Sequence, residues 1–386
     1  MTALPQTRGR SGGVPGALPQ EVRSNERSDL GSDPPNGSPR GLPSDLPRAA
    51  HRLTWWITLA ALLLLGLLIL HLGMGSAPLT PAEVTAALTG RPIEPWHRDV
   101  VIGLRMPRGL IAVTAGAMLG VAGAHLQAVT RNVLADPGLL GVSAGAVLAV
   151  VVGASFGLVS VSSGWTPVVA TGGALASGAL VYWLGWHGGA ADATRFVLNG
   201  VLVSAIGSAL VAVVLTLDGS TFGTVLRWIV GTLHARTWEH WQVLWPWAIV
   251  SLVIALGAIR GATVLWSGYD VATAVGAHPT RIRLAVFGSA ALLTAGAVCT
   301  VGAVGFVGLV AAHLVRPLVG HHPARVIPMA AFAGAALLLG ADIVANGLTF
   351  AIPGDQIGGR ASLPTGAVTA LVGGPLLLAL ILKERR

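Results

Sequence analysis

Long apolar runs separated by short polar segments make up most of the chain. The first run, residues 55–75 (WWITLAALLLLGLLILHLGMG), holds one histidine and no residue with a fixed charge. A helix needs about 20 apolar residues to cross the hydrocarbon core of a bilayer. This run is therefore predicted to be a transmembrane helix.

The same pattern predicts an all-α, polytopic membrane protein with about ten transmembrane helices. They are expected at 53–73, 108–130, 139–158, 165–186, 196–217, 241–260, 282–302, 305–320, 326–346 and 364–382. The 52 glycines of the chain fit this interpretation, because small residues let helices pack closely in lipid.

Residues 1–50 differ from the rest of the chain and form the first predicted domain. They are rich in Pro, Gly, Ser and Arg and poor in aromatic residues, which predicts a disordered tail. Arginines before a first transmembrane helix favour a cytoplasmic N-terminus. Ten spans then place the C-terminus in the cytoplasm as well, and residues 51–386 form the membrane domain.

Composition excludes a soluble protein. The chain is 53% hydrophobic and 10% charged, whereas soluble domains carry about a quarter charged residues. The formal net charge of +8 is attributed to loop arginines and not to nucleic-acid binding. The sole lysine, Lys383, lies four residues from the end, so the chain lacks the lysine of a phosphate-binding P-loop.

Three stretches, in order, are similar to the permease family of the iron-siderophore, haem and vitamin B12 ABC importers, the type II importers. They are 105–146 (RMPRGLIAVTAGAMLGVAGAHLQAVTRNVLADPGLLGVSAGA), 302–316 (GAVGFVGLVAAHLVR) and 363–382 (LPTGAVTALVGGPLLLALIL). The resemblance implies a non-enzymatic, multi-pass subunit of the cytoplasmic (inner) membrane, without a cofactor. The implied partners are cytoplasmic ABC ATPase subunits, an extracytoplasmic substrate-binding protein and a second permease subunit.

The resemblance assigns a docking role to outer arginines. The family's R-x-P-R arginines, which pair with acidic residues of the binding protein, correspond to Arg105 and Arg108. A further family arginine falls on Asn346, and Arg360 in the following loop is a candidate to replace it. From the residues alone, arginines that extend to lipid headgroups explain this outer cluster equally well.

The resemblance also places a cytoplasmic gate at Asn132 and Leu134, and at Ala193 and Thr194 of the fifth span. Val133 departs from the family's usual proline. Ordinary turn chemistry is the alternative explanation for residues 132–137.

Residues 267–283 correspond to the segment that docks on the ATPase. The residues expected to carry this coupling role are Ala272, Ala274, Val275, Gly276 and Arg281. An ordinary interfacial loop is the alternative.

Asp342 lies in an apolar stretch, so its side chain is expected to face the bundle interior. A structural polar contact is favoured over proton coupling, which would make the chain an ion-coupled secondary transporter. A membrane-embedded enzyme is disfavoured because the polar residues His125, Gln127, Asn199 and Asp342 lie on separate spans.

No metal site is predicted, because no further His, Cys or carboxylate stands at a ligand spacing from the histidines. The sequence leaves open whether the ligand is a siderophore, haem or cobalamin. A ferric siderophore is favoured because that branch of the family is the most common. The second permease subunit is either an identical chain or a relative.

Overall fold

The computed structural model describes residues 46–75, 77–138, 141–159, 165–185, 193–217, 229–351 and 360–384. The chain divides into two units, Met1–Ala49 and Ala50–Arg386, and the second holds almost all described residues. The prediction of a disordered tail falls almost entirely outside the described residues.

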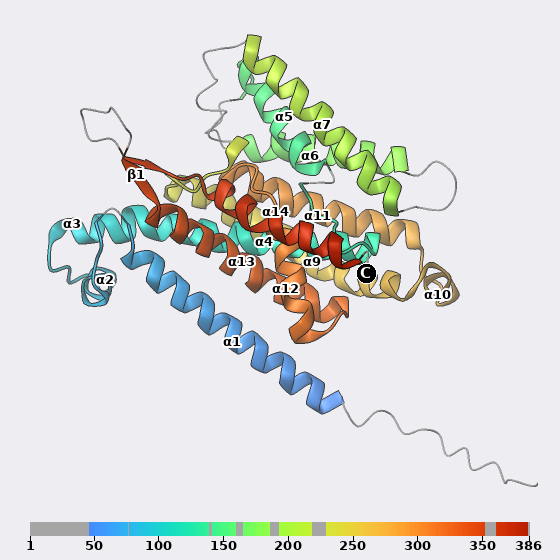
Figure 1. The fold of residues 1–386 in the computed structure, drawn as a ribbon, viewed down its shortest axis with the longest axis horizontal. Coiled ribbons are helices and arrows are strands. Elements are labelled where there is room, and N and C mark those ends of the chain that lie inside the picture. The colour runs from blue at the N-terminus through green and yellow to red at the C-terminus, as the bar shows by residue number, and fades with distance from the viewer. Residues whose placement is uncertain are drawn as a thin grey trace, which may run out of the picture. The chain divides into compact units, whose positions relative to one another are not determined.

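The described part of the second unit consists of helices and one short β-ribbon (Figure 1). The helices are α1 (Leu46–Gly73), α2 (Pro81–Leu88), α3 (Pro95–Arg98), the π-helix η2 (Asp99–Arg105), α4 (Met106–Thr130), α5 (Val142–Ser155), α6 (Thr166–Gly185), α7 (Ala193–Leu217), α9 (Trp238–Ser267), α10 (Tyr269–Ala274), α11 (Pro279–Val301), α12 (Val307–Val319), α13 (Pro323–Gly347) and α14 (Thr365–Glu384). Strand β1 (Thr349–Ala351) pairs antiparallel with β2 (Arg360–Ser362). This ribbon is a departure from the all-α prediction.

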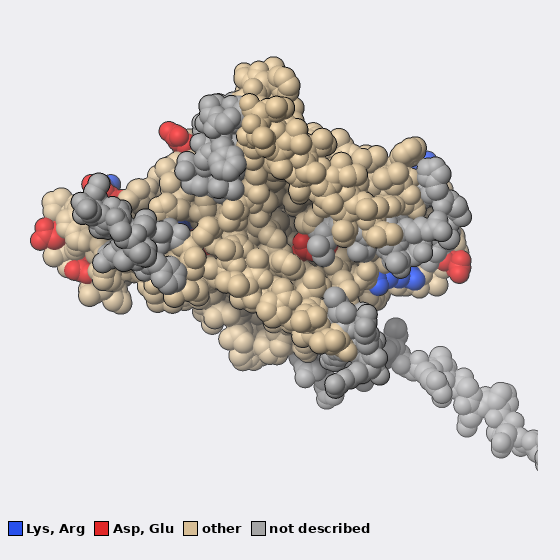
Figure 2. Space-filling model, turned by 45° about the horizontal axis from the view of Figure 1, so that its top comes forward, with Lys and Arg blue, Asp and Glu red and all other residues tan. Residues whose placement is uncertain are grey.

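Apolar helices lie in all ten segments predicted to span the membrane. Among the described residues, seven helices are long and apolar enough to cross a bilayer, and three shorter apolar helices fall at 142–155, 307–319 and 365–380. The helical membrane fold is therefore confirmed, while the number of spans and the side of the termini stay predictions. Figure 2 shows that uncharged residues cover most of one face of the molecule.

The second predicted span begins earlier than its pattern indicates. Helices α3, η2 and α4 form one stretch of 36 residues, whereas the prediction started at residue 108. The π-turn ends beside Pro107, which has no N–H to donate, and the N–H of Met106 bonds Val101. The indole Nε1 of Trp238 donates to the Ile102 carbonyl at 2.9 Å and so pairs a carbonyl of this irregular turn.

Helix α4 is the centre of the bundle and packs against α9, α11, α12 and α13. Gly116 and Gly120 of α4 face Gly334 and Ala330 of α13 so closely that a Cβ on either α4 glycine would collide with a backbone oxygen. This is the small-residue packing that membrane helices use, where backbone contact replaces a hydrophobic driving force.

Candidate functional site

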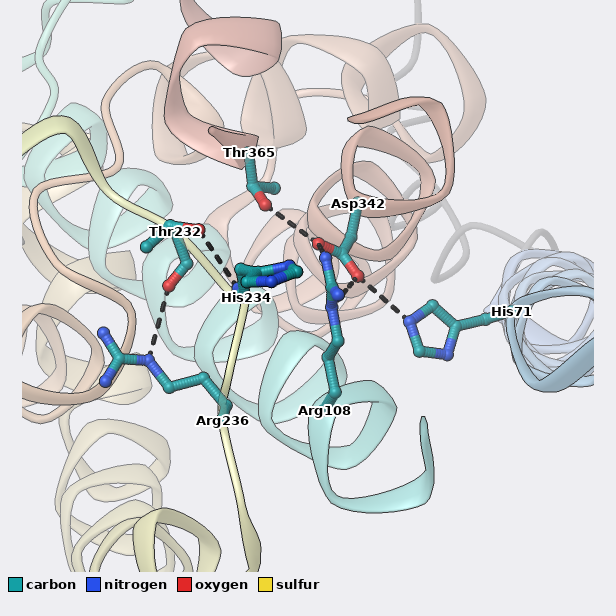
Figure 3. A network of polar contacts seen from close by, with 7 residues as sticks. All are labelled: His71, Arg108, Thr232, His234, Arg236, Asp342 and Thr365. Atoms are coloured by element: carbon teal, nitrogen blue, oxygen red, sulfur yellow. Dashed lines mark hydrogen bonds and ion pairs between the residues drawn. The ribbon is translucent and has the colours of Figure 1, made fainter. Parts of the chain in front are cut away.

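A buried carboxylate joins four helices of the bundle (Figure 3). Asp342 of α13 accepts hydrogen bonds from Nε and Nη2 of Arg108, both at 2.8 Å. Nε2 of His71 lies 3.0 Å from Oδ2, and Oγ1 of Thr365 donates to Oδ1 at 2.8 Å. The prediction that Asp342 faces the interior and makes a structural contact is confirmed.

Arg105, the other arginine of the R-x-P-R sequence, is also used within the chain. Its side chain is buried, and Nη1 donates to the Leu72 carbonyl at 2.7 Å. Nη2 donates to the carbonyl of Ala77. Because Leu72 lies in the last turn of α1, Arg105 places positive charge at the negative end of that helix.

A cavity of about 400 Å³ lies beside this cluster, and we call it the arginine cavity. Its polar walls are Arg105, Arg108, Arg236, His71, His234 and Asn346. The first two are predicted docking residues, and Asn346 is the position where the family has a further arginine. The structure therefore brings three positions of the docking prediction to one cavity.

The segment Gly231–Thr237 supplies residues of the arginine cavity that sequence reasoning missed. The Thr232 N–H bonds the carbonyl of Val301 at 2.9 Å, and Nε of Arg236 donates to the Thr232 carbonyl at 3.4 Å. Burial lowers the pKa of Arg236 to about 10, so the guanidinium stays charged at neutral pH. Burial, followed by the nearby charge of Arg108, lowers the pKa of His234.

Arg360, the third predicted docking residue, lies in strand β2, where it pairs with Ala351. Its side chain lies outside the described residues. The docking role of Arg360 thus stays a prediction from the sequence.

Residues 131–138, which we call the gate turn, connect α4 toward α5. Oδ1 of Asn132 accepts the N–H of Leu134 at 2.8 Å, which is the expected turn chemistry. Oδ2 of Asp136 accepts the N–H of Leu309 at 3.0 Å and so fixes the turn to α12. Leu134 packs with the apolar side chains between α12 and α14.

The other two predicted gate residues, Ala193 and Thr194, begin α7, and their side chains lie outside the described residues. Farther along α7, Oγ of Ser204 donates to the carbonyl of Gly138 at 3.3 Å. Helix α7 therefore contacts the gate turn.

The predicted coupling segment forms the short helix α10 and the turn after it. Ala272 is buried, while Ala274, Val275 and Arg281 are exposed. Gly276 has a φ of +75°, a left-handed conformation that glycine adopts without strain. The segment thus exposes apolar and basic groups at the end of α9.

Arg131 connects the gate turn with the coupling segment, and sequence reasoning missed it. Its Nη2 donates to the carbonyls of Leu265 at 2.8 Å and Trp266 at 3.2 Å, just before α9 ends. Arg131 itself has a φ of +50°, which is uncommon outside glycine. An arginine in a left-handed residue at a helix end was the one signal in the sequence, and it is weak.

The remaining buried polar groups form separate pairs. Nη2 of Arg316 donates to Oε1 of Gln127 at 2.5 Å, and Nδ1 of His125 lies 3.0 Å from Oγ of Ser289. Within the described residues, no three His, Cys, Asp or Glu side chains are grouped to hold a metal ion.

A bundle of apolar helices with a neutralised buried carboxylate and a polar turn between helices defines a polytopic transport protein. The FecCD transport family matches residues 62–383, so the chain belongs to that family. The resemblance seen in the sequence is thereby confirmed.

Relatives with described roles agree with this assignment. The chain is 35% identical to the Fe(3+)-citrate import system permease protein YfmD of Bacillus subtilis, over 74% of this chain and 82% of the relative. It is 32% identical to the Fe(3+) dicitrate transport system permease protein FecC of Escherichia coli, over 85% and 96%. It is 33% identical to the cobalamin import system permease protein BtuC of Halobacterium salinarum, over 74% of each chain.

A solved structure has the same fold. It is an inward-facing metal-chelate type ABC transporter, with a TM-score of 0.70 and 26% identity, covering 84% of this chain and 97% of that one. Together with the import permeases, it supports an ABC importer subunit over an ion-coupled secondary transporter.

Proposed function

We propose that this chain is the permease subunit of an ATP-driven importer that carries a ferric siderophore, or a related metal chelate, across the cytoplasmic membrane. The observation that carries the proposal is the family match over 62–383, with iron-chelate permeases among the relatives. Haem and cobalamin are the alternative ligands.

Separate ATPase subunits are the proposed source of energy. The chain has one lysine, Lys383, and hence no P-loop of its own. The coupling segment supports the proposal because Val275 is 67% exposed, although it is apolar, and Arg281 lies beside it. An exposed apolar side chain at a helix end is suited to a protein partner.

A second permease subunit is proposed to complete the passage. Helix α7 supports this proposal, because apolar side chains on one helix are left uncovered, among them Leu198, Leu202 and Ile206 at 52–61% exposure. Lipid covers such a face as well as a protein does, and contact between α7 and the gate turn favours the protein.

Docking of a substrate-binding protein is proposed on the outer side, around Arg105, Arg108 and Arg360. Arg105 and Arg108 support it by lining the arginine cavity, where their bonds to Leu72 and Asp342 hold the walls in place.

Asp342 favours this importer over proton coupling. Both of its oxygens accept hydrogen bonds from Arg108, and burial without these donors would make the carboxylate costly. A group that carries protons through a transport cycle must lose and regain such partners, whereas an internal counter-ion keeps them.

Uptake in cells lacking this gene tests the proposed function. Radiolabelled ferric citrate, a ferric hydroxamate siderophore and cobalamin are supplied in turn, with the wild-type chain restored or absent. Uptake of one of the three should depend on the chain, survive an uncoupler for as long as ATP is maintained, and stop when ATP is depleted. Chain-dependent uptake that an uncoupler abolishes at constant ATP would refute the proposal.

A further inference from the structure

Arg236 is a cation in the arginine cavity without a carboxylate partner among the described residues. Its only hydrogen bond there is the long one from Nε to the Thr232 carbonyl, 3.4 Å. Figure 3 shows its guanidinium on the far side of the Gly231–Thr237 segment from Asp342. The Nη groups of Arg236 are therefore not committed to that carboxylate.

The other two arginines of the cavity are satisfied inside the chain. Arg108 is the bidentate partner of Asp342, and Arg105 donates to two backbone carbonyls. Asp342 is the one carboxylate bonded at this cavity among the described residues, and Arg108 and His71 already share it. The walls thus hold an excess of positive charge, and Arg236 is where this excess meets no internal acceptor.

The cavity is separate from the predicted passage. Its lining comes from the end of α1, from η2, α4 and α13, and from the Gly231–Thr237 segment. None of its lining residues belongs to the gate turn or to α7. A ligand in this cavity is therefore suited to holding a partner in place and not to passing through the membrane.

We propose that Arg236 binds a carboxylate side chain of the extracytoplasmic substrate-binding protein, which enters the arginine cavity beside His234. The proposal rests on the importer function above and names its docking contact. A cavity of about 400 Å³ accommodates side chains of a partner. Guanidinium and carboxylate form strong, bidentate hydrogen bonds, and the partly buried position protects them from screening.

The inference separates two roles that the sequence assigned together. Arg108 serves as the internal counter-ion of Asp342, so its substitution disturbs the bundle before it can report on docking. Arg236 takes the place of the family arginine that is Asn346 here, because both line the same cavity. A change at Arg236 leaves the Asp342 cluster intact.

Binding of the purified substrate-binding protein to the full transporter in lipid nanodiscs tests the contact. Arg236→Gln should weaken the Kd by about 10-fold to 100-fold, as expected when a charged hydrogen bond is lost, and Arg236→Glu by more. The control is Arg98→Gln in α3, which removes an exposed arginine outside the cavity and should leave the Kd within about twofold of wild type. An unchanged Kd for Arg236→Glu overturns the inference.

A second measurement needs no binding protein. Cys299 is the single cysteine of the chain, so Cys299→Ala provides a cysteine-free background. Met74, which lines the cavity and is 38% exposed, is then replaced by cysteine. An anionic methanethiosulfonate should react faster there than a cationic one, and Arg236→Gln should remove the preference. Equal rates with Arg236 present would overturn the inference.

The two measurements distinguish this inference from the importer function. A binding protein that fails to bind the wild-type transporter refutes the proposed function and, with it, the proposed partner. A binding protein that binds wild type and Arg236→Glu equally well leaves the importer standing and removes only the docking contact.

Discussion

Replacement of Asp342 by asparagine is the most informative perturbation of the bundle. The side chain keeps its shape but loses its charge, and Arg108 then retains a guanidinium whose side chain is only 14% exposed. One amide oxygen cannot accept the two 2.8 Å bonds from Arg108 and also the bond from Thr365. Breaking one partner out of a buried ion pair costs about 3–5 kcal/mol.

The single cysteine makes the assay direct. Cys299 is buried, and a thiol-reactive fluorophore labels it as the protein unfolds on heating. We expect a clearly lower unfolding midpoint for Asp342→Asn, and a smaller decrease for Thr365→Val, which removes one hydrogen bond worth about 1–3 kcal/mol.

The double variant Asp342→Leu/Arg108→Met supplies the control, because removing both charges leaves no unpaired ion. It should recover most of the stability lost in Asp342→Asn. A midpoint for Asp342→Asn equal to wild type, or a double variant less stable than the single one, would show that the pair is not the stabilising contact described here.

Three further predictions follow from particular contacts. Gly334→Ala should destabilise the bundle because its Cβ meets the backbone of α4, whereas Gly340→Ala in the same helix meets nothing and should not; the same thermal assay compares them. Arg131→Ala should lower uptake far more than ATP hydrolysis in the reconstituted transporter, and an equal loss of both would contradict a linking role. Binding of the substrate-binding protein should strengthen below about pH 6.5, where His234 beside Arg108 gains a proton and adds positive charge to the cavity; the rise in affinity should vanish in His234→Gln.

The helices were predictable because each uses a run of apolar residues long enough to be read alone. The start of the second span was not, because the π-turn before Pro107 depends on contacts such as the bond from the Trp238 indole to Ile102. A window of hydrophobicity carries no record of a partner that lies 136 positions away.

The candidate site followed the same division. The sequence pointed to Asp342 as an interior group and to Arg108 as a notable arginine. It did not show that they are partners, because they lie 234 positions apart and one sequence holds no pairing information. Arg131 and Arg236 were passed over for the same reason, since a loop arginine is ordinary until its neighbours are known.

ATP-dependent transport in proteoliposomes tests the central claim most directly. The chain is reconstituted with the ATPase subunits and the substrate-binding protein of its transport system, and radiolabelled ferric chelate uptake is measured. The account predicts uptake that requires ATP and the binding protein and that proceeds without an ion gradient. Uptake driven by a proton or sodium gradient in the absence of ATP would contradict it.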